Sequence, residues 1–293
     1  MNTLKILIIF LPLNLLSQNL ILNPEFKSAS CAQYIGLFNS HALKWSSPTF
    51  GSTDLFNICN IGDAGVPDNF NGSQNAMGGN NYVGCYFYSK NNYREYIQGA
   101  FSSSLEKDTH YRISLFISLA ENSNAALKSI EFLVTKSKIK IATHSELSNN
   151  QLNKLKIEYS EVYSIDSEDF YDDTKKWTLI SAEIIAKGNE NFITIGNFKN
   201  NLETEKKQLS SLKEREMSYY YISEVLVEKI NKPVYKEEII PVPSETETSN
   251  LKENKFIEID KKHIFKNIQF DFNSVILSVL AESELNDLYE VLI

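Results

Sequence analysis

The stretch YRISLFISL at residues 111–119 decides the predicted fold of this chain. Its odd-numbered positions are all apolar and its even-numbered positions mostly polar; the apolar set is Tyr111, Ile113, Leu115, Ile117 and Leu119. Successive side chains of a β-strand point to opposite faces of the sheet, so this alternation is typical of a strand with one buried face. A helix would distribute the same residues around its circumference. We therefore predict a central strand of an antiparallel β-sandwich.

Similar short segments recur along the chain, with turn signals between them and no long helical pattern. We expect further strands at residues 19–26, 82–88, 93–98, 129–135, 155–163, 177–185, 191–198 and 219–227. Residues 27–80 are rich in Gly, Pro, Asn and Ser, which predicts long surface loops. This succession favours an all-β jelly roll or related sandwich over residues 19–231.

Residues 1–18 have the features of a secretory signal peptide. Lys5 provides a positive charge, and residues 4–16 are nearly all apolar. This run is shorter than the about 20 residues that span a bilayer, which disfavours the alternative of an uncleaved anchor. We expect an exported protein in the periplasm or associated with the outer membrane. The net charge of −8 argues against nucleic acid as a partner.

The three cysteines of the chain suggest one disulfide and one free thiol. Cys31 and Cys59 lie in turn-rich segments, and a bond between them would stabilise the fold by about 3 kcal/mol on a chain-entropy estimate. Cys85 alternates with Val83 and Phe87, as a buried thiol would. Three unpaired thiols are the alternative. The sequence has no cluster of cysteines and histidines with zinc-ligand spacing.

The C-terminal part has a different composition. Residues 232–255 mix Pro and Glu without an apolar pattern and are predicted to form an extended linker. Residues 256–293 then predict one strand and the start of one helix, a short α/β unit with no second layer to cover it. We interpret this unit as the beginning of an incomplete domain.

Several stretches resemble known families. NPEF at 23–26 and YYYISEVLV at 219–227 resemble the opening and closing strands of carbohydrate-binding-module-like sandwiches, which implies a galactose-binding-like fold. The blocks PTFGSTDLFNIC, GVPDNFNG and YREYIQ resemble the N-terminal sandwich found before OmpA-like domains of Gram-negative envelope proteins. The final stretch, IFKNIQFDFNSVILSVLAESELNDLYEVLI, is similar to the opening of an OmpA-like domain.

These resemblances imply two sets of ligands. OmpA-like domains bind peptidoglycan through an Asp and an Arg that follow their first helix, and this sequence ends before those positions, so peptidoglycan is expected as a partner only of a full-length domain. Related sandwiches often hold a structural calcium ion. Here Lys27 stands at one carboxylate position and Ser223-Glu224 at the others, so we expect no bound metal and no cofactor; a structural calcium ion with Glu224 as one ligand is the alternative.

The candidate ligand-binding residues combine amides, a carboxylate and tyrosines: Asp68, Asn69, Gln74, Tyr86, Tyr88, Tyr93 and Tyr96. Aromatic faces suit the C–H groups of sugars, and amides and carboxylates suit sugar hydroxyls. Tyrosines that pack at the margin of the core are the alternative. Arg94 and Glu95 are predicted to form an exposed ion pair, or alternatively to hold a ligand carboxylate.

The sequence contains no Gly-x-Ser-x-Gly, His-Glu-x-x-His or phosphate-binding glycine loop. We therefore predict a non-catalytic cell-envelope protein whose sandwich binds glycan or protein. One alternative is a structural or adhesion module that binds another envelope protein. Another is a polysaccharide-active enzyme with two catalytic carboxylates, whose separation a sequence does not give.

Overall fold

The computed structural model describes residues 18–154, 156, 159–209 and 216–230. The predicted linker (232–255) and OmpA-like unit (256–293), and residues 1–17 of the predicted signal peptide, lie outside the described residues. None of the described helices is long and apolar enough to cross a membrane.

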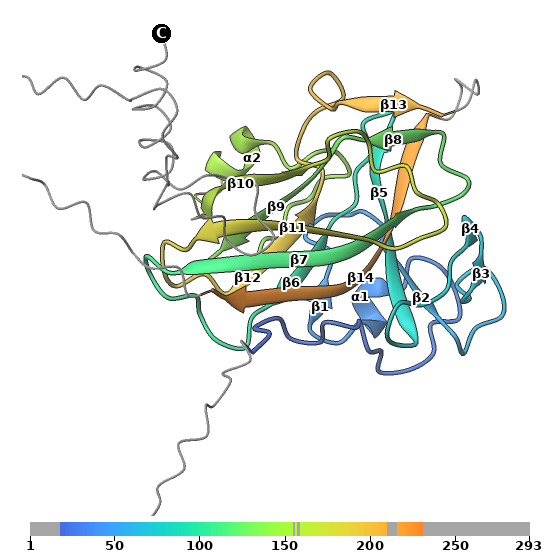
Figure 1. Cartoon of the computed structure of the whole chain (residues 1–293), viewed down its shortest axis with the longest axis horizontal. Helices are drawn as coiled ribbons and strands as arrows, with labels where there is room; N and C mark the ends of the chain where they lie inside the picture. Colours follow the sequence, from blue (N-terminus) through green and yellow to red (C-terminus); the bar gives the residue numbers. More distant parts are fainter. Residues whose placement is uncertain (1–17, 155, 157–158, 210–215, 231–293) are drawn as a thin grey trace, which may run out of the picture. The chain divides into compact units, whose positions relative to one another are not determined.

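Two five-stranded antiparallel sheets form the body of the protein (Figure 1). The first sheet has the order β1 (Trp45–Ser46), β6 (Ile97–Ala100), β12 (Phe192–Gly196), β9 (Ser129–Thr135) and β10 (Tyr159–Asp166). The second has the order β11 (Thr178–Ile185), β7 (His110–Leu119), β14 (Met217–Lys229), β5 (Asn81–Ser89) and β2 (Asp54–Asn57).

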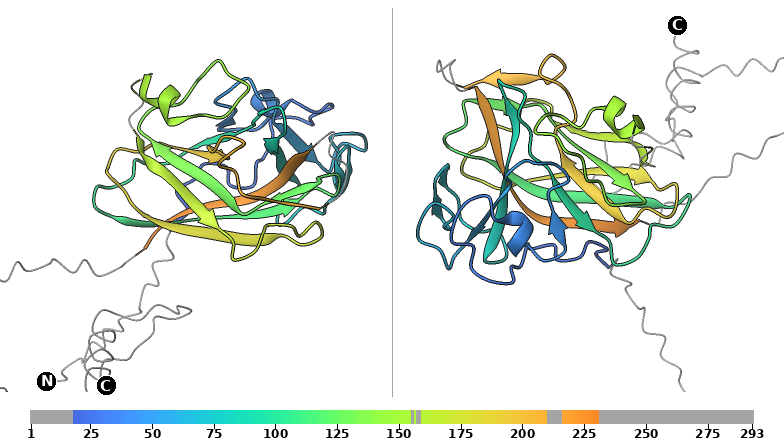
Figure 2. Two further views of the ribbon diagram at one scale, coloured as in Figure 1. Left: turned by 90° about the horizontal axis from the view of Figure 1, so that it is seen from above. Right: turned by 180° about the vertical axis from the view of Figure 1, so that it is seen from behind.

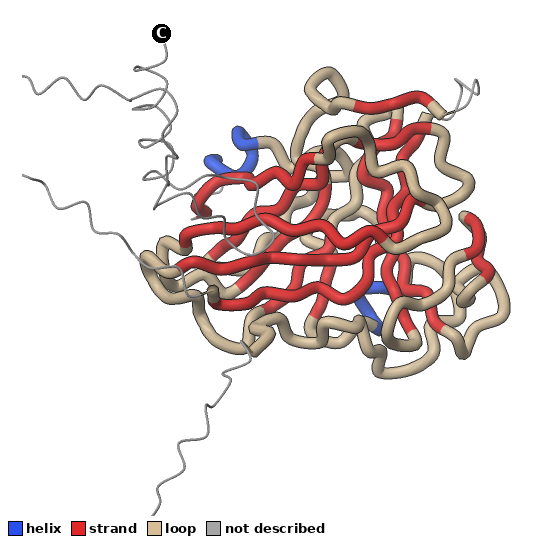
Figure 3. The backbone as a smooth tube through the Cα atoms, in the orientation of Figure 1, coloured by secondary structure: helices blue, strands red, loops and turns tan. Residues whose placement is uncertain are grey.

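The other described elements are short. β3 (Asp68–Asn69) pairs with β4 (Gly72–Ser73), and β8 (Ala125–Leu127) pairs with β13 (Lys206–Gln208). The described helices are α1 (Phe38–His41) and α2 (Asn149–Lys154), coloured blue among the strands in Figure 3. The all-β sandwich predicted from the sequence is therefore confirmed.

The core lies between the two sheets, which Figure 2 shows from two further directions. Ile113 and Leu115 of β7 belong to one buried cluster with Ile193 and Ile195 of β12. β7 lies between β11 and β14. Ile113 of β7 is in register with Ala182 of β11 on one side and with Val227 of β14 on the other. The alternating stretch that predicts a central strand thus forms one.

Two predicted strands differ in the structure. Residues 19–26 form only an isolated bridge from Ile21 to Phe101, because Asn23 (φ 59°) and Phe26 (φ 54°) have left-handed backbone conformations that interrupt an extended segment. The strand predicted at residues 93–98 begins only at Ile97, because residues 90–96 carry the chain from the second sheet to the first.

Both sheets are covered on their outer faces. Residues 136–154 pack over the first sheet, where Leu133 and Tyr96 meet Ile139 and Leu147 in a second buried cluster. The β3–β4 hairpin and its flanks cover part of the second sheet, where Phe70 packs against an aromatic cluster that includes Phe56, Tyr82, Tyr219 and Tyr221.

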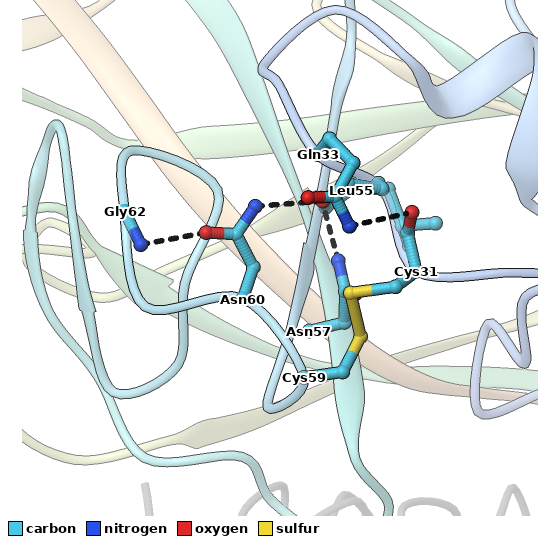
Figure 4. The surroundings of a disulfide bond; sticks show 8 residues. Cys31, Gln33, Leu55, Asn57, Cys59, Asn60 and Gly62 are labelled. Atoms are coloured by element: carbon cyan, nitrogen blue, oxygen red, sulfur yellow. Dashed lines mark hydrogen bonds between the residues drawn. A yellow bond between two sulfur atoms is a disulfide. The ribbon is translucent and has the colours of Figure 1, made fainter.

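Cys31 and Cys59 form a disulfide, with their Cα atoms 6.0 Å apart (Figure 4). It joins the segment before α1 to the turn that follows β2. The side-chain amide of Asn60 donates to the Ala32 carbonyl at 2.8 Å, so the same two segments are also joined by a hydrogen bond. Cys85 is a buried free thiol on β5.

Candidate ligand-binding site

Alternation along β5 supplies the first side chain of the site. Val83, Cys85 and Phe87 face the core, so Tyr86 lies on the outer face of the second sheet. Gly84 leaves room beside it: a Cβ at this position would lie 2.2 Å from the Tyr219 hydroxyl oxygen. The Tyr219 ring therefore packs over β5 and contacts the Tyr86 ring edge-on, with 4.7 Å between centroids.

Four rings continue outward from this point, and we name Tyr86, Tyr93, His144 and Phe50 the aromatic row. Asn92 turns the chain with φ 63°, which returns Tyr93 to Tyr86 at 6.0 Å between ring centroids. His144 stacks on Tyr93 at 6.1 Å, and Phe50 contacts His144 at 5.5 Å. The row ends in solvent, because Phe50 is 58% exposed.

Backbone hydrogen bonds hold the loops that carry the aromatic row. The Phe50 N–H donates to the Thr143 carbonyl, and the Arg94 N–H donates to the His144 carbonyl, both at 2.9 Å. Residues 50, 93–94 and 143–144 are therefore fixed to one another although they are far apart in the sequence. The row is built by loop contacts and not by a single strand.

Glu95 lies buried behind the row and organises two of its rings. One carboxylate oxygen accepts hydrogen bonds from the Tyr93 hydroxyl at 2.7 Å and the Ser52 hydroxyl at 3.2 Å; the other accepts from the Tyr86 N–H at 2.9 Å. Burial, and secondarily repulsion from the carboxylate of Asp54, raise the pKa of Glu95 to about 7.

Asp54, on β2, is the second buried carboxylate near the row. It accepts a hydrogen bond from the Tyr219 hydroxyl at 2.5 Å and another from the Gly36 N–H at 2.6 Å. Burial raises the pKa of Asp54 to about 6, against the opposite effect of these two hydrogen bonds. Among the described residues, no three His, Cys, Asp or Glu side chains gather as they would around a metal ion.

A cavity of about 580 Å³ opens beside the inner end of the row. Tyr86 and Tyr93 form its aromatic wall, and the remaining lining is mainly polar: Ser89, Lys90, Asn91, Glu216 and Met217. Its volume is in the range of small-ligand sites, and it combines an apolar wall with a few polar groups as such sites do. The site therefore suits a ligand with both C–H faces and hydroxyl groups.

Only two of the four predicted tyrosines reach this surface, which corrects the prediction that all four share it. Tyr96 is buried: its hydroxyl donates to the Asn197 carbonyl at 2.6 Å and accepts from the Leu147 N–H at 2.9 Å. Tyr88 is buried too, with the Arg94 guanidinium 5.2 Å from its ring centroid.

The polar residues predicted together with these tyrosines do not line the cavity, and most of them form hydrogen bonds that stabilise the fold. Gln74 is buried and donates to the Ser118 hydroxyl at 2.5 Å. Asn69 donates to the Tyr82 hydroxyl at 3.0 Å and accepts from the Tyr221 hydroxyl at 2.8 Å, which fixes the β3–β4 hairpin to the second sheet. Asp68 is exposed on β3 and does not line the cavity.

The predicted exposed ion pair of Arg94 and Glu95 is wrong, because both side chains are buried and have other partners. The Arg94 guanidinium donates to the Asn201 side-chain oxygen at 2.7 Å and to the Lys199 carbonyl at 3.3 Å. Residues 93–96 cross between the sheets, and a crossing segment buries neighbouring side chains that an edge strand would expose. Sequence reasoning considered Glu95 only as one of an exposed pair that could hold a ligand carboxylate, and it did not single out Asp54, Phe50 or His144 as parts of the site.

No protein family of known sequence profile matches the chain, and no curated protein matches it. Among solved structures, it is similar to the CBM22-1 xylan-binding domain of Xyn10C from Paenibacillus barcinonensis: 10% identity, 74% of this chain and 98% of that chain, TM-score 0.39. It is also similar to a putative sugar-binding protein from Bacteroides thetaiotaomicron, with 11% identity and a TM-score of 0.33, over 73% of this chain and 100% of that chain. A third similar structure is that of TmCBM61 in complex with β-1,4-galactotriose, with 11% identity and a TM-score of 0.31, over 73% of this chain and 100% of that chain.

Proposed function

We propose that the β-sandwich is a non-catalytic glycan-binding module and that the aromatic row and its cavity form the binding site. The observation that carries the proposal is the pairing of the Tyr86 and Tyr93 rings on one wall of a cavity of about 580 Å³ with otherwise mainly polar lining. A sugar ring offers C–H groups on its faces and hydroxyls at its edge. The first would contact the tyrosine rings, and the second would bond to the polar lining.

The fixed position of the rings favours this use. Glu95 holds the Tyr93 hydroxyl and the Tyr86 N–H at once, and Ser52 donates its own N–H to the Tyr93 hydroxyl oxygen at 2.9 Å. Rings that are already held in the free protein lose little conformational freedom when a ligand arrives. Weak contacts between sugar and ring can then contribute more of their free energy to binding.

A glycoside hydrolase is the competing proposal that the two buried carboxylates would suggest. Both catalytic carboxyl groups of such an enzyme must reach the scissile bond. Glu95 is 1% exposed and Asp54 4% exposed, and each is hydrogen-bonded to a tyrosine hydroxyl. Neither carboxylate is accessible to a glycosidic oxygen, which favours binding over catalysis by this pair.

The cellular setting of this function is a proposal from the sequence. Export to the periplasm or outer membrane rests on the signal-like residues 1–18, and attachment to the envelope rests on the resemblance of residues 264–293 to an OmpA-like domain. In that setting, the partner would be an envelope or environmental glycan, with an envelope protein as the alternative.

A glycan array probed with the full chain tests the proposal. We expect binding to at least one class of oligosaccharide, reduced in Phe50→Ala and unchanged in Ile185→Ala. These two side chains are similarly exposed, at 58% and 53%, but Ile185 lies on β11 at the opposite edge of the second sheet from β2. Absence of binding to every glycan, or an equal loss in both variants, would refute glycan binding at this site.

A further inference from the structure

A second cavity, of about 440 Å³, lies on the outer face of the first sheet, and we name it the β1 groove. It is lined by residues of the α1–β1 segment together with Gln98, Ala100, Phe192 and Lys138. It has no lining residue in common with the cavity beside Tyr86 and Tyr93. Its ligand would therefore be bound independently of the aromatic row.

Ser46 and Gln98, which line the β1 groove, belong to a polar row that crosses three neighbouring strands. Ser46 of β1 is in register with Gln98 of β6, which is in register with Thr194 of β12. The hydroxyls of Ser46 and Thr194 are buried without a hydrogen-bond partner among the described residues. Buried hydroxyls are normally paired, and of these two residues only Ser46 lines the groove, so its hydroxyl is the candidate to bond to a ligand or to water held by it.

The charge of the groove is opposite to that of the chain. Its lining contains Lys44, Lys138 and His41 and not one carboxylate, in a protein with a net charge of −8. Within the described part of the chain, neither lysine forms an ion pair. Two ammonium groups without local counter-ions favour an anionic ligand.

The backbone beside both lysines is fixed by side-chain hydrogen bonds. The Asn23 amide donates to the Leu43 carbonyl at 2.7 Å, next to Lys44. The Gln98 side chain bonds to both backbone groups of Ile139, accepting from its N–H at 2.7 Å and donating to its carbonyl at 3.0 Å, next to Lys138. The two positive charges therefore come from anchored segments.

We propose that the β1 groove binds an acidic saccharide, one that bears a carboxylate or sulfate group. The lysines would hold the anionic group, the half-buried Phe192 ring would contact a sugar face, and the Ser46 hydroxyl would face a sugar hydroxyl. The cavity volume is that of a small-organic-ligand site and exceeds what a bare inorganic anion fills.

Titration of the full chain with trigalacturonate at low salt tests this assignment. We expect binding that weakens as salt rises and falls about tenfold or more in the double variant Lys44→Gln/Lys138→Gln, because charge-assisted hydrogen bonds to the carboxylate are lost. The control double variant Lys107→Gln/Lys176→Gln changes the net charge equally at exposed positions and is expected to bind as the native chain does.

Two further arms separate this proposal from its rivals. Ile185→Ala, at a residue that lines neither cavity, should leave trigalacturonate binding unchanged. Lys44 and Lys138 do not line the cavity beside Tyr86 and Tyr93, so failure of the aromatic row as a glycan site would not affect the result. Sodium sulfate should compete only weakly at matched ionic strength. No trigalacturonate binding by the native chain, equal binding by Lys44→Gln/Lys138→Gln, or sulfate binding as tight as that of the saccharide would each overturn the proposal.

Discussion

Replacing Glu95 by Gln should remove a pH dependence of stability that the native fold carries. The carboxyl group of Glu95 is buried, and its pKa is raised from the ordinary 4.5 to about 7 in the folded protein. Between these two pH values the folded state binds more protons at this group than the unfolded state. The free energy of unfolding therefore falls as pH rises through this window.

The magnitude follows from the shift in pKa. Each unit corresponds to about 1.4 kcal/mol, so ionisation of Glu95 costs the fold about 3 kcal/mol on passing from pH 4.5 to above 7. Below pH 4.5 the Glu95 carboxyl group is protonated in both the folded and the unfolded state, so none of this stability is lost there. The pKa of Asp54, raised to about 6, gives a second loss of the same sign over a lower window.

Urea unfolding between pH 5 and pH 8 measures this effect. The unfolding free energy of the native chain should decrease over this range, and Glu95→Gln should show a smaller decrease. Glu203→Gln, at an exposed position, is the control and should keep the native slope. A native slope in Glu95→Gln, or stability that rises with pH because of this group, would refute the reasoning.

Two further changes test the packing around the site. Gly84→Ala should destabilise the fold by about 1–3 kcal/mol, because the added Cβ would overlap the Tyr219 hydroxyl. Gly62→Ala is the control and should have little effect, because its Cβ would meet only the Asn60 side chain, at 3.3 Å. Thermal unfolding compares the two variants. Removing the disulfide with Cys31→Ser/Cys59→Ser should lower the unfolding free energy by about 3 kcal/mol. An unchanged urea midpoint in that double variant would contradict a structural role for the bond.

The central strand is predictable because its signal is local. The alternation at residues 111–119 predicts which side chains face the core without knowledge of the neighbouring strands, and β7 has these side chains in the core. The same reasoning predicts that Cys85 faces inward beside Val83 and Phe87, as it does. Strand pairing and sheet order depend on contacts between residues far apart in the sequence, so a local alternation pattern does not predict them.

The candidate site is only partly predictable because loops assemble it. Tyr86 lies on a strand whose alternation can be read, but Tyr93 meets it only through the turn at Asn92. Phe50 and His144 join the row through backbone contacts between segments far apart in the sequence. Tyr96 has the same local signature as Tyr93, yet residues 136–154 bury it.

Calorimetric titration with the oligosaccharide that the array selects tests the central claim most directly. Tyr93→Ala removes one of the two rings that form the aromatic wall of the cavity, whereas Tyr93→Phe keeps the ring and loses only the hydroxyl that donates to Glu95. We predict a loss of affinity of about tenfold or more for Tyr93→Ala, about 1.4 kcal/mol, and a much smaller loss for Tyr93→Phe. Native affinity in a folded Tyr93→Ala protein would contradict the claim that this tyrosine surface binds the glycan.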